Sequence, residues 1–438
     1  MLLNAADKAL WRLALPMIFS NITVPLLGLV DTAVIGHLDS PVYLGGVAVG
    51  ATATSFLFML LLFLRMSTTG LTAQAWGAKD PQRLARALVQ PLALALGAGV
   101  LIILLRLPLI DLALHIVGGS EAVLEQARRF LEIRWLSAPA SLANLVLLGW
   151  LLGVQYARAP VILLVVGNLL NIVLDLWLVM GLRMNVQGAA LATVTAEYAT
   201  LIIGLLMAKR VLTLRGVSLA MLKNAWRWDL RRLLALNRDI MLRSLLLQLC
   251  FGALTVFGAR LGSDIVAVNA VLMTMLTFTA YALDGFAYAV EAHSGQAYGA
   301  RDGSQLLEVW RAACRQSGMV ALAFALIYSL AGQYIIALLT SLPSLQQLAD
   351  RYLIWQTILP VVGVWCYLLD GMFIGATRGA EMRNSMAVAA AGFAVTLLTL
   401  PVLGNHGLWL ALAVFLALRG LSLALIWRRH WRRGTWFS

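Results

Sequence analysis

The chain has 438 residues, of which 61% are hydrophobic and only 12% are charged, and its formal net charge is +13. Soluble domains carry about 25% charged residues, so the composition excludes an ordinary soluble domain. Apolar runs of roughly 20 residues, long enough to cross a bilayer, recur along the whole chain. The sequence therefore predicts an all-α polytopic membrane protein.

The first apolar run follows Lys8 and Arg12 but lacks the small-residue cleavage site of a signal peptide. We expect this run to be the first membrane helix. Hydropathy and helix-breaking residues predict twelve membrane helices, which lie in chain order at about 11–37, 46–76, 84–108, 124–154, 160–181, 186–209, 239–260, 266–298, 306–340, 350–377, 383–403 and 406–427.

A polar, basic stretch after the sixth helix is the predicted boundary between two halves. We expect a first lobe of helices 1–6 at 1–209, a cytoplasmic linker at 210–238, and a second lobe of helices 7–12 at 239–438 that ends in a short basic tail. Lys and Arg gather at both termini and in alternate connections, and the positive-inside rule places these segments in the cytoplasm. The basic charge is thus a topology signal, and no nucleic-acid partner is expected.

One short loop occurs twice. Residues 74–84 read QAWGAKDPQRL and residues 296–306 read QAYGARDGSQL, an offset of 222 (296 − 74). In each copy a glycine can end one helix and an aspartate can cap the next, with Asp80-Pro81 in the first copy. Six helices per half is an even number, so the sequence predicts parallel lobes related by a pseudo-two-fold axis along the membrane normal. Secondary transporters use this arrangement; a duplicated channel suits it less well.

Three polar residues of the first half are expected at one depth, about 10 Å below the outer surface: Asp31 in the first helix, Asp175 in the fifth and Thr193 in the sixth. Asn171 lies four residues before Asp175 on the same face of the fifth helix. A carboxylate within a bilayer helix costs about 2.5–3.5 kcal/mol on insertion scales. Two carboxylates with an amide and a hydroxyl can hold one proton or a small hard cation. The alternative is a hydrogen-bond network that packs helices together.

The second half lacks this group but has acidic residues of its own. At the repeat offset, Asp175 corresponds to Leu397, whereas Asp370 corresponds to Leu148. Asp284 is a further candidate, either for substrate binding or as a partner of Arg243.

Three stretches, PLLGLVDTAVIGHL, GNLLNIVLDLWLV and LLDGMFIGATRGAEMRNS, together with the doubled loop, resemble the multidrug and toxic compound extrusion (MATE) transporters. The similarity covers the whole chain and is greatest to the DinF-like branch. The resemblance implies antiport, in which influx of H⁺ or Na⁺ drives export of amphipathic, often cationic compounds without a cofactor. It also implies that Asp31, Asn171, Asp175 and Thr193 form the cation or proton site of the first lobe.

The resemblance has two further implications. Asp370 matches an acidic position that the NorM branch uses for cation coupling. That branch also has a glutamate early in helix 7, where this chain reads MLRSLLLQ with Arg243, so a complete sodium site is not expected in the second lobe. Pro16 and Pro25 remove backbone hydrogen bonds inside the first helix, and by family analogy the resulting bend couples ion binding to transport.

We therefore expect a monomeric antiporter of the bacterial inner membrane, with both termini cytoplasmic, small-molecule substrates and lipids as partners, and no metal site. H⁺ is the expected coupling ion, although the same side chains can coordinate Na⁺. The alternative is a lipid-precursor flippase of the same superfamily, a class that usually has fourteen helices and a strongly cationic cleft. The chain shows no H-E-x-x-H or G-x-S-x-G motif, so no enzyme is expected.

Overall fold

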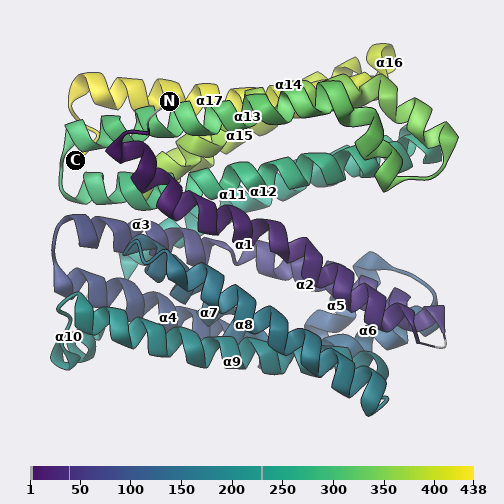
Figure 1. Cartoon of the computed structure of the whole chain (residues 1–438), viewed down its shortest axis with the longest axis horizontal. Helices are drawn as coiled ribbons and strands as arrows, with labels where there is room; N and C mark the ends of the chain where they lie inside the picture. The colour runs from purple at the N-terminus through teal and green to yellow at the C-terminus, as the bar shows by residue number, and fades with distance from the viewer. Residues whose placement is uncertain (1–2, 39, 228–229) are drawn as a thin grey trace. The chain divides into compact units, whose positions relative to one another are not determined.

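The computed structural model describes residues 3–38, 40–227 and 230–438, without the side chains of residues 23–32 and 227. Throughout these residues the regular elements are helical, and they contain no strand (Figure 1). Eleven helical stretches with described side chains are long and apolar enough to cross a membrane. Helix α1, Ala5–Gly36, has 32 residues and is long enough to be a twelfth. The predicted all-α polytopic fold is confirmed.

The chain divides into two compact units, which are described here separately. The first unit contains residues 22–233. It begins with the second half of α1, and its further elements are α2 Pro41–Leu60, α3 Phe63–Gly77, α4 Pro81–Leu104, α5 Arg106–Val117, α6 Glu121–Arg134, η1 Trp135–Ser137, α7 Ala138–Gly153, α8 Arg158–Asp175, η2 Leu176–Gly181, α9 Asn185–Leu214, α10 Leu219–Asn224 and η3 Ala225–Arg227.

The second unit combines residues 234–438 with the chain up to Asn21. Its elements after α1 are α11 Arg231–Leu261 (shared at its first turn with the other unit), α12 Ser263–Gly299, α13 Gly303–Leu339, α14 Pro343–Gly375, α15 Gly379–Thr396, η4 Leu397–Thr399, α16 Leu400–Leu403 and α17 Asn405–Arg433.

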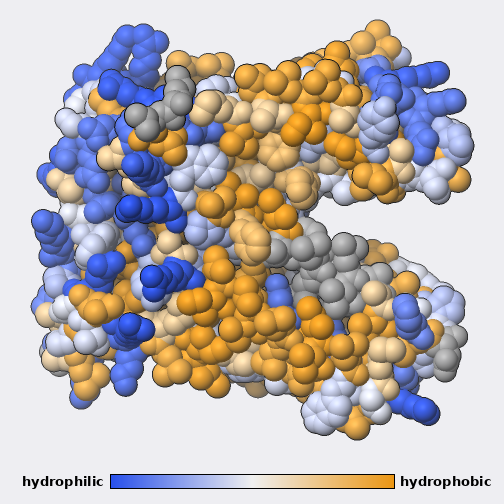
Figure 2. Space-filling model, in the orientation of Figure 1, coloured by the Kyte–Doolittle hydropathy of each residue, from blue (hydrophilic) through white to orange (hydrophobic). Residues whose placement is uncertain are grey.

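Several of the expected membrane helices are interrupted. The segment expected at 46–76 is broken between α2 and α3, and the segment expected at 124–154 contains the 3₁₀ turn η1 just before Pro139. Proline has no backbone N–H to donate to a carbonyl of the preceding turn, which explains the second interruption. Apolar residues cover the middle of the helices and hydrophilic residues gather toward their ends, as a membrane-spanning chain requires (Figure 2).

The repeated loops fold alike. Asp80 caps α4 by accepting from the backbone N–H groups of Gln82 at 3.1 Å and Arg83 at 3.3 Å, and Asp302 caps α13 by accepting from that of Gln305 at 3.1 Å. The predicted helix ends at Gly77 and Gly299 are confirmed. Both halves thus use the same local chemistry to reverse the chain between two long helices.

The repeat extends to backbone conformation that the sequence did not reveal. Lys79 and Arg301 both have a left-handed backbone, with φ of 54° and 53°, and so do Gln155 and Thr377, with φ of 63° and 55°. Each pair is separated by 222 residues (301 − 79; 377 − 155). In every case the next residue's N–H bonds a carbonyl five residues before it, which closes the end of the helix.

Each loop also carries an aromatic residue that is covered by the chain following the sixth helix of its half. The Arg215 guanidinium lies over the Trp76 ring, 4.2 Å from its centroid. In the other unit, Phe437 packs on Tyr298 with ring centroids 5.5 Å apart. Residues 215 and 437 again differ by 222 (437 − 215), so the C-terminal tail is the structural counterpart of the start of the linker.

The first half of α1 packs with α12 and α13 within the second unit. The Trp11 indole N–H donates to Gln316 at 3.0 Å, and the Asn21 amide donates to the carbonyl of Tyr281 at 3.1 Å. The two helix backbones come close at Gly285, where an added Cβ would lie 2.8 Å from the nitrogen of Ile18. Pro16 lies inside this packed segment of continuous helix, whereas the side chain of Pro25 lies outside the described residues.

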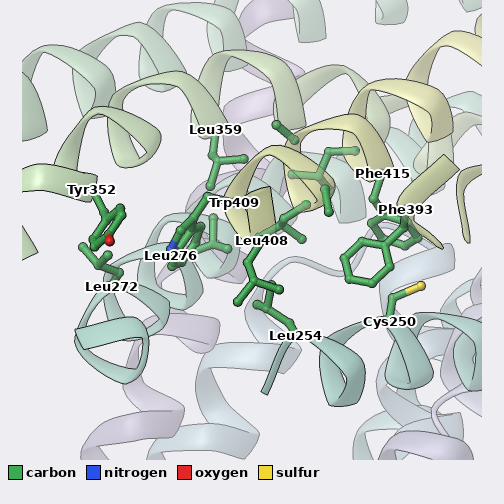
Figure 3. Close-up of a cluster of buried hydrophobic side chains, with 14 of the residues drawn as sticks. Cys250, Leu254, Leu272, Leu276, Tyr352, Leu359, Phe393, Leu408, Trp409 and Phe415 are labelled. Atoms are coloured by element: carbon green, nitrogen blue, oxygen red, sulfur yellow. The ribbon is translucent and has the colours of Figure 1, made fainter. Parts of the chain in front are cut away.

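A tightly packed apolar core holds the second unit together (Figure 3). Trp409 lies at its centre and is fully buried, and its indole N–H donates to Asn269 at 3.0 Å. Asn269 and Asn405 exchange two amide hydrogen bonds of 2.9 and 2.8 Å, which joins α12 to α17. Such paired amides satisfy polar groups that lipid cannot hydrate.

Candidate functional site

The first candidate site lies where α8 meets α9. Asn171 and Asp175 are four residues apart on one face of α8, and both are buried, with 3% and 1% of their surface exposed. The Asn171 side-chain amide donates to the Thr193 hydroxyl of α9 at 3.4 Å, and that hydroxyl donates to the carbonyl of Ala189 at 3.2 Å. The structure therefore brings Asn171 and Thr193 together, with Asp175 one helical turn away from Asn171.

A change of helix type follows the carboxylate directly. Asp175 is the last residue of α8, and the chain continues as a π-helical turn, η2. Gly188 lets α9 approach this turn, because an added Cβ would lie 3.1 Å from the carbonyl of Leu178. Wide turns of this kind occur frequently at functional sites. The sequence thus holds a buried carboxylate at an irregular point of a membrane helix.

Asp31 belongs to α1, but its side chain lies outside the described residues. Its place beside Asp175 therefore stays a prediction, as does the role of Pro25.

The second candidate site joins three helices of the other unit. Oδ2 of Asp370 on α14 accepts from Nη2 of Arg243 on α11 at 2.6 Å, and it also accepts from Nη2 of Arg419 on α17. All three residues are buried. The group has two guanidinium charges and one carboxylate charge, so its formal sum is +1. Charge-assisted bonds of this kind are about twice as strong as neutral ones.

The two bonds from arginine limit the capacity of the Asp370 carboxylate to bind a metal cation. One of its oxygens accepts from two cationic donors that already neutralise it, so an added metal cation would have to compete with both. Asp284 lies on α12, half-buried and one helical turn after Tyr281. Arg243, its expected partner, donates to Asp370.

Among the charged residues of membrane helices that sequence reasoning overlooked, two lie at equivalent positions of the two halves. One is Arg419, which completes the bonds to Asp370. The other is Glu197 on α9, whose carboxylate accepts from the Asn144 amide at 3.1 Å. They occupy equivalent positions of the two halves (419 − 222 = 197) with opposite charge. A search of apolar segments for every charged residue, basic as well as acidic, would have found both.

Apolar membrane-spanning helices with a few buried, bonded charges define a polytopic membrane protein, and two halves with the same repeated loop are typical of a secondary transporter. A family model described as MatE matches residues 16–177 and 240–403, one match in each half. The chain belongs to the MatE family, so the predicted family is confirmed, and a transporter of this family is not an enzyme.

Curated relatives agree with this assignment. The chain is 87% identical over 436 residues to the DNA damage-inducible protein F of Escherichia coli strain K12, a match that covers 100% of this chain and 95% of that protein. It is 23% identical to the probable multidrug resistance protein NorM of Acinetobacter baylyi, over 96% of this chain and 94% of that protein.

Solved structures support the fold. A MATE transporter in the straight conformation superposes with a TM-score of 0.85 at 23% identity, and another in an outward-facing conformation with 0.82 at 24%. Both matches cover 98% of this chain and 96% of the other.

Proposed function

We propose that this transporter exports amphipathic, cationic small molecules in exchange for protons. The family membership supports transport, and relatives bear names that refer to multidrug resistance and detoxification. The coupling ion and the charge of the substrate are inferred from the buried charges.

The observation that carries the proposal is the buried carboxylate of Asp175 beside the Asn171–Thr193 pair. An ionised carboxylate within a bilayer helix costs about 2.5–3.5 kcal/mol, and one proton removes that cost. Together with Asp31, the site can either take up a proton or attract a cation. If a cationic substrate and a proton favour opposite charge states of one site, each weakens binding of the other, which is the thermodynamic basis of antiport.

The charges of the second unit support a single coupling site in the first half. Asp370 accepts from two guanidinium groups, so its charge is already compensated by the protein. We therefore propose that H⁺ couples at Asp31 and Asp175, and that Asp370 and Arg243 hold helices of the second half together. Asp284 stays a candidate for substrate contact.

We also propose that both termini face the cytoplasm of a bacterial inner membrane. The two termini lie at one end of their unit, because the Arg315 side chain donates to Asp7 and the Tyr298 hydroxyl donates to the carbonyl of Ser438. This end also contains the α12–α13 loop and the basic residues of the tail (Figure 1), and the positive-inside rule assigns such an end to the cytoplasm.

The test is uptake of a cationic dye into proteoliposomes under an imposed pH gradient or an imposed Na⁺ gradient. We expect the wild type to follow the pH gradient, and Asp175→Asn and Asp31→Asn to lose most of this response. Asp350→Asn, an exposed carboxylate on α14, is the matched control and should transport normally. Transport that follows the Na⁺ gradient at constant pH would refute proton coupling.

A second measurement separates drug export from lipid flipping. We expect excess cationic dye of a second kind to compete with the first, and a lipid-linked saccharide to have no effect. Competition by the saccharide alone would assign the chain to the flippase class.

A further inference from the structure

Glu197 is a carboxylate near the middle of a membrane-spanning helix. Helix α9 is long and apolar enough to span a membrane, and Glu197 lies 12 residues after its start and 17 before its end (197 − 185; 214 − 197). At 1.5 Å per residue, this position is about 18 Å from the nearer end of the helix. Ionisable side chains are costly at such a depth, and they usually mark a functional site.

The side chain that bonds Glu197 is neutral. The Asn144 amide of α7 donates to the Glu197 carboxylate at 3.1 Å and to the Glu197 backbone carbonyl at 3.2 Å. The Oδ1 atom of Asn144 is enclosed and accepts no hydrogen bond within the described part of the chain. Both residues are half-buried, so the pair is not sealed within the packing. The pair therefore combines a negative charge with an acceptor that lacks a donor.

The ion pairs of the described residues do not include Glu197. The neighbouring α7 and η1 contain no charged residue, and α8 contains a single arginine, at its first residue. Arg134 of α6 lies ten residues before Asn144 (144 − 134), about 15 Å along the helix axis, and donates to Ser137. Within α9 the nearest cationic residue is Lys209, 12 residues after Glu197 (209 − 197).

Helix packing alone does not account for this charge. Neutral amides and hydroxyls join membrane helices by hydrogen bonds, and a glutamine at position 197 could pair with Asn144 without bringing a charge into the bilayer. The second half compensates the charge at its equivalent position, because Arg419 (197 + 222) donates to Asp370. In the first half, the residue equivalent to Asp370 is Leu148 (370 − 222). The charge of Glu197 is therefore left for a cation from outside the chain.

An ammonium group fits these contacts. It has a positive charge and N–H donors but no acceptor, so it can neutralise the Glu197 carboxylate and also donate to Oδ1 of Asn144. That oxygen becomes accessible when the amide turns about its Cβ–Cγ bond, a torsion with broad energy wells. The ammonium then takes the place of the Asn144 amide as donor to the carboxylate, through a stronger, charge-assisted bond.

We propose that Glu197, together with Asn144, binds the ammonium group of the exported cation. Thr193 and Glu197 are four residues apart on one face of α9, so this site lies one helical turn from the Asn171–Thr193 pair. Protonation of Asp175 removes a negative charge that helps to hold the ammonium, so each ligand weakens binding of the other. The inference rests on the proposed export of cations and adds the residue that recognises them.

The test measures binding of three fluorescent dansyl amides to the full chain in detergent at neutral pH. One ends in a dimethylamino group, which is protonated and has an N–H donor, the second ends in a trimethylammonium group, which has none, and the third is the neutral dansyl butylamide. We expect Glu197→Gln to weaken binding of both cationic dyes about tenfold or more and to bind the neutral dye as the wild type does, which also shows that the variant is folded.

Two further variants separate charge from hydrogen bonding. Glu197→Asp keeps the charge and should retain the preference for the cationic dyes. Asn144→Leu removes the oxygen that accepts from the ammonium, so it should weaken binding of the dimethylamino dye about fivefold and leave that of the trimethylammonium dye nearly unchanged. The matched control is Glu121→Gln, which removes the same charge from an exposed position at the start of α6 and should bind all three dyes normally.

Equal affinity of the wild type and Glu197→Gln for both cationic dyes would overturn the proposal and leave the export of cations untouched. A wild type that binds the neutral dye as tightly as the cationic dyes would instead contradict the proposed function. Sodium ions distinguish an organic from an inorganic cation. If Na⁺, but not K⁺ at the same concentration, displaces the dimethylamino dye from the wild type and not from Glu197→Gln, the site binds a metal cation and the ammonium assignment is wrong.

Discussion

Removing the carboxylate of Asp370 should destabilise the protein more than any other single charge change in the second unit. In Asp370→Asn, two buried guanidinium groups lose the negative charge that both contact. Breaking a buried ion pair from one side costs about 3–5 kcal/mol, which raises the unfolded population roughly 100- to 4,000-fold at about 1.4 kcal/mol per factor of ten.

The assay is reversible unfolding in mixed detergent micelles, with Asp350→Asn as the control on the same helix. The control removes an exposed carboxylate and should leave the free energy of unfolding within about 0.5 kcal/mol of the wild type. The triple variant Arg243→Met/Asp370→Leu/Arg419→Met replaces the whole group by apolar side chains. It should recover most of the lost stability, because a buried ion group and a well-packed apolar group are often nearly equal in free energy.

Equal stability of Asp370→Asn and Asp350→Asn would refute the idea that the Arg243–Asp370–Arg419 group holds the second unit together. Transport adds a second criterion. Per folded molecule, Asp370→Asn should keep a measurable part of its pH-driven efflux, whereas Asp31→Asn should lose almost all of it.

Three further predictions concern the C-terminal tail, the first repeated loop and the start of α1. Trp436→Ala empties a site where the side chain is 1% exposed, so it should lower the free energy of unfolding by about 3–5 kcal/mol, whereas Trp226→Ala, at an exposed position, should lower it little. Lys79 has a left-handed backbone with φ of 54°, which glycine adopts without steric strain. Lys79→Gly should therefore raise the free energy of unfolding by about 1 kcal/mol or less. Burial tends to raise the pKa of Asp7, but bonds from Arg315 and the Asn4 backbone outweigh it and lower that pKa. The stabilisation by Asp7 should thus be present above the pKa of an unfolded aspartate, about 4, and be lost as the pH falls through the lower pKa of the folded protein. In the same unfolding assay Asp7→Asn should therefore differ from the wild type at pH 7, and this difference should shrink on acidification.

Composition and periodicity predicted the membrane class, the number of long helices and the repeated loops, because these depend on local sequence. The caps at Asp80 and Asp302 follow from residue type and spacing alone. The Arg243–Asp370–Arg419 group could not be predicted in this way, because its members are far apart in the sequence. Arg243 and Asp370 are separated by 127 residues, and Asp370 and Arg419 by 49. Their contact depends on how three helices rotate about their axes.

The packing of the first half of α1 was also beyond sequence reasoning. Sequence placed residues 1–209 in one lobe, whereas the chain up to Asn21 packs with residues 234–438 in the structure. The sequence of a continuous apolar helix says little about which neighbouring helices pack against each part of it. The contacts of Trp11 and Asn21 with α13 and α12 decide it. The lobe boundaries relevant to transport stay a prediction.

The most direct test of proton coupling is proton release when a substrate binds. Purified transporter in weakly buffered detergent solution is mixed with a cationic dye, and the pH change is recorded. The account predicts that the wild type and Asp350→Asn release protons on dye binding, and that Asp175→Asn binds dye without releasing them. Dye binding without proton release in the wild type, or equal release by Asp175→Asn, would contradict the account.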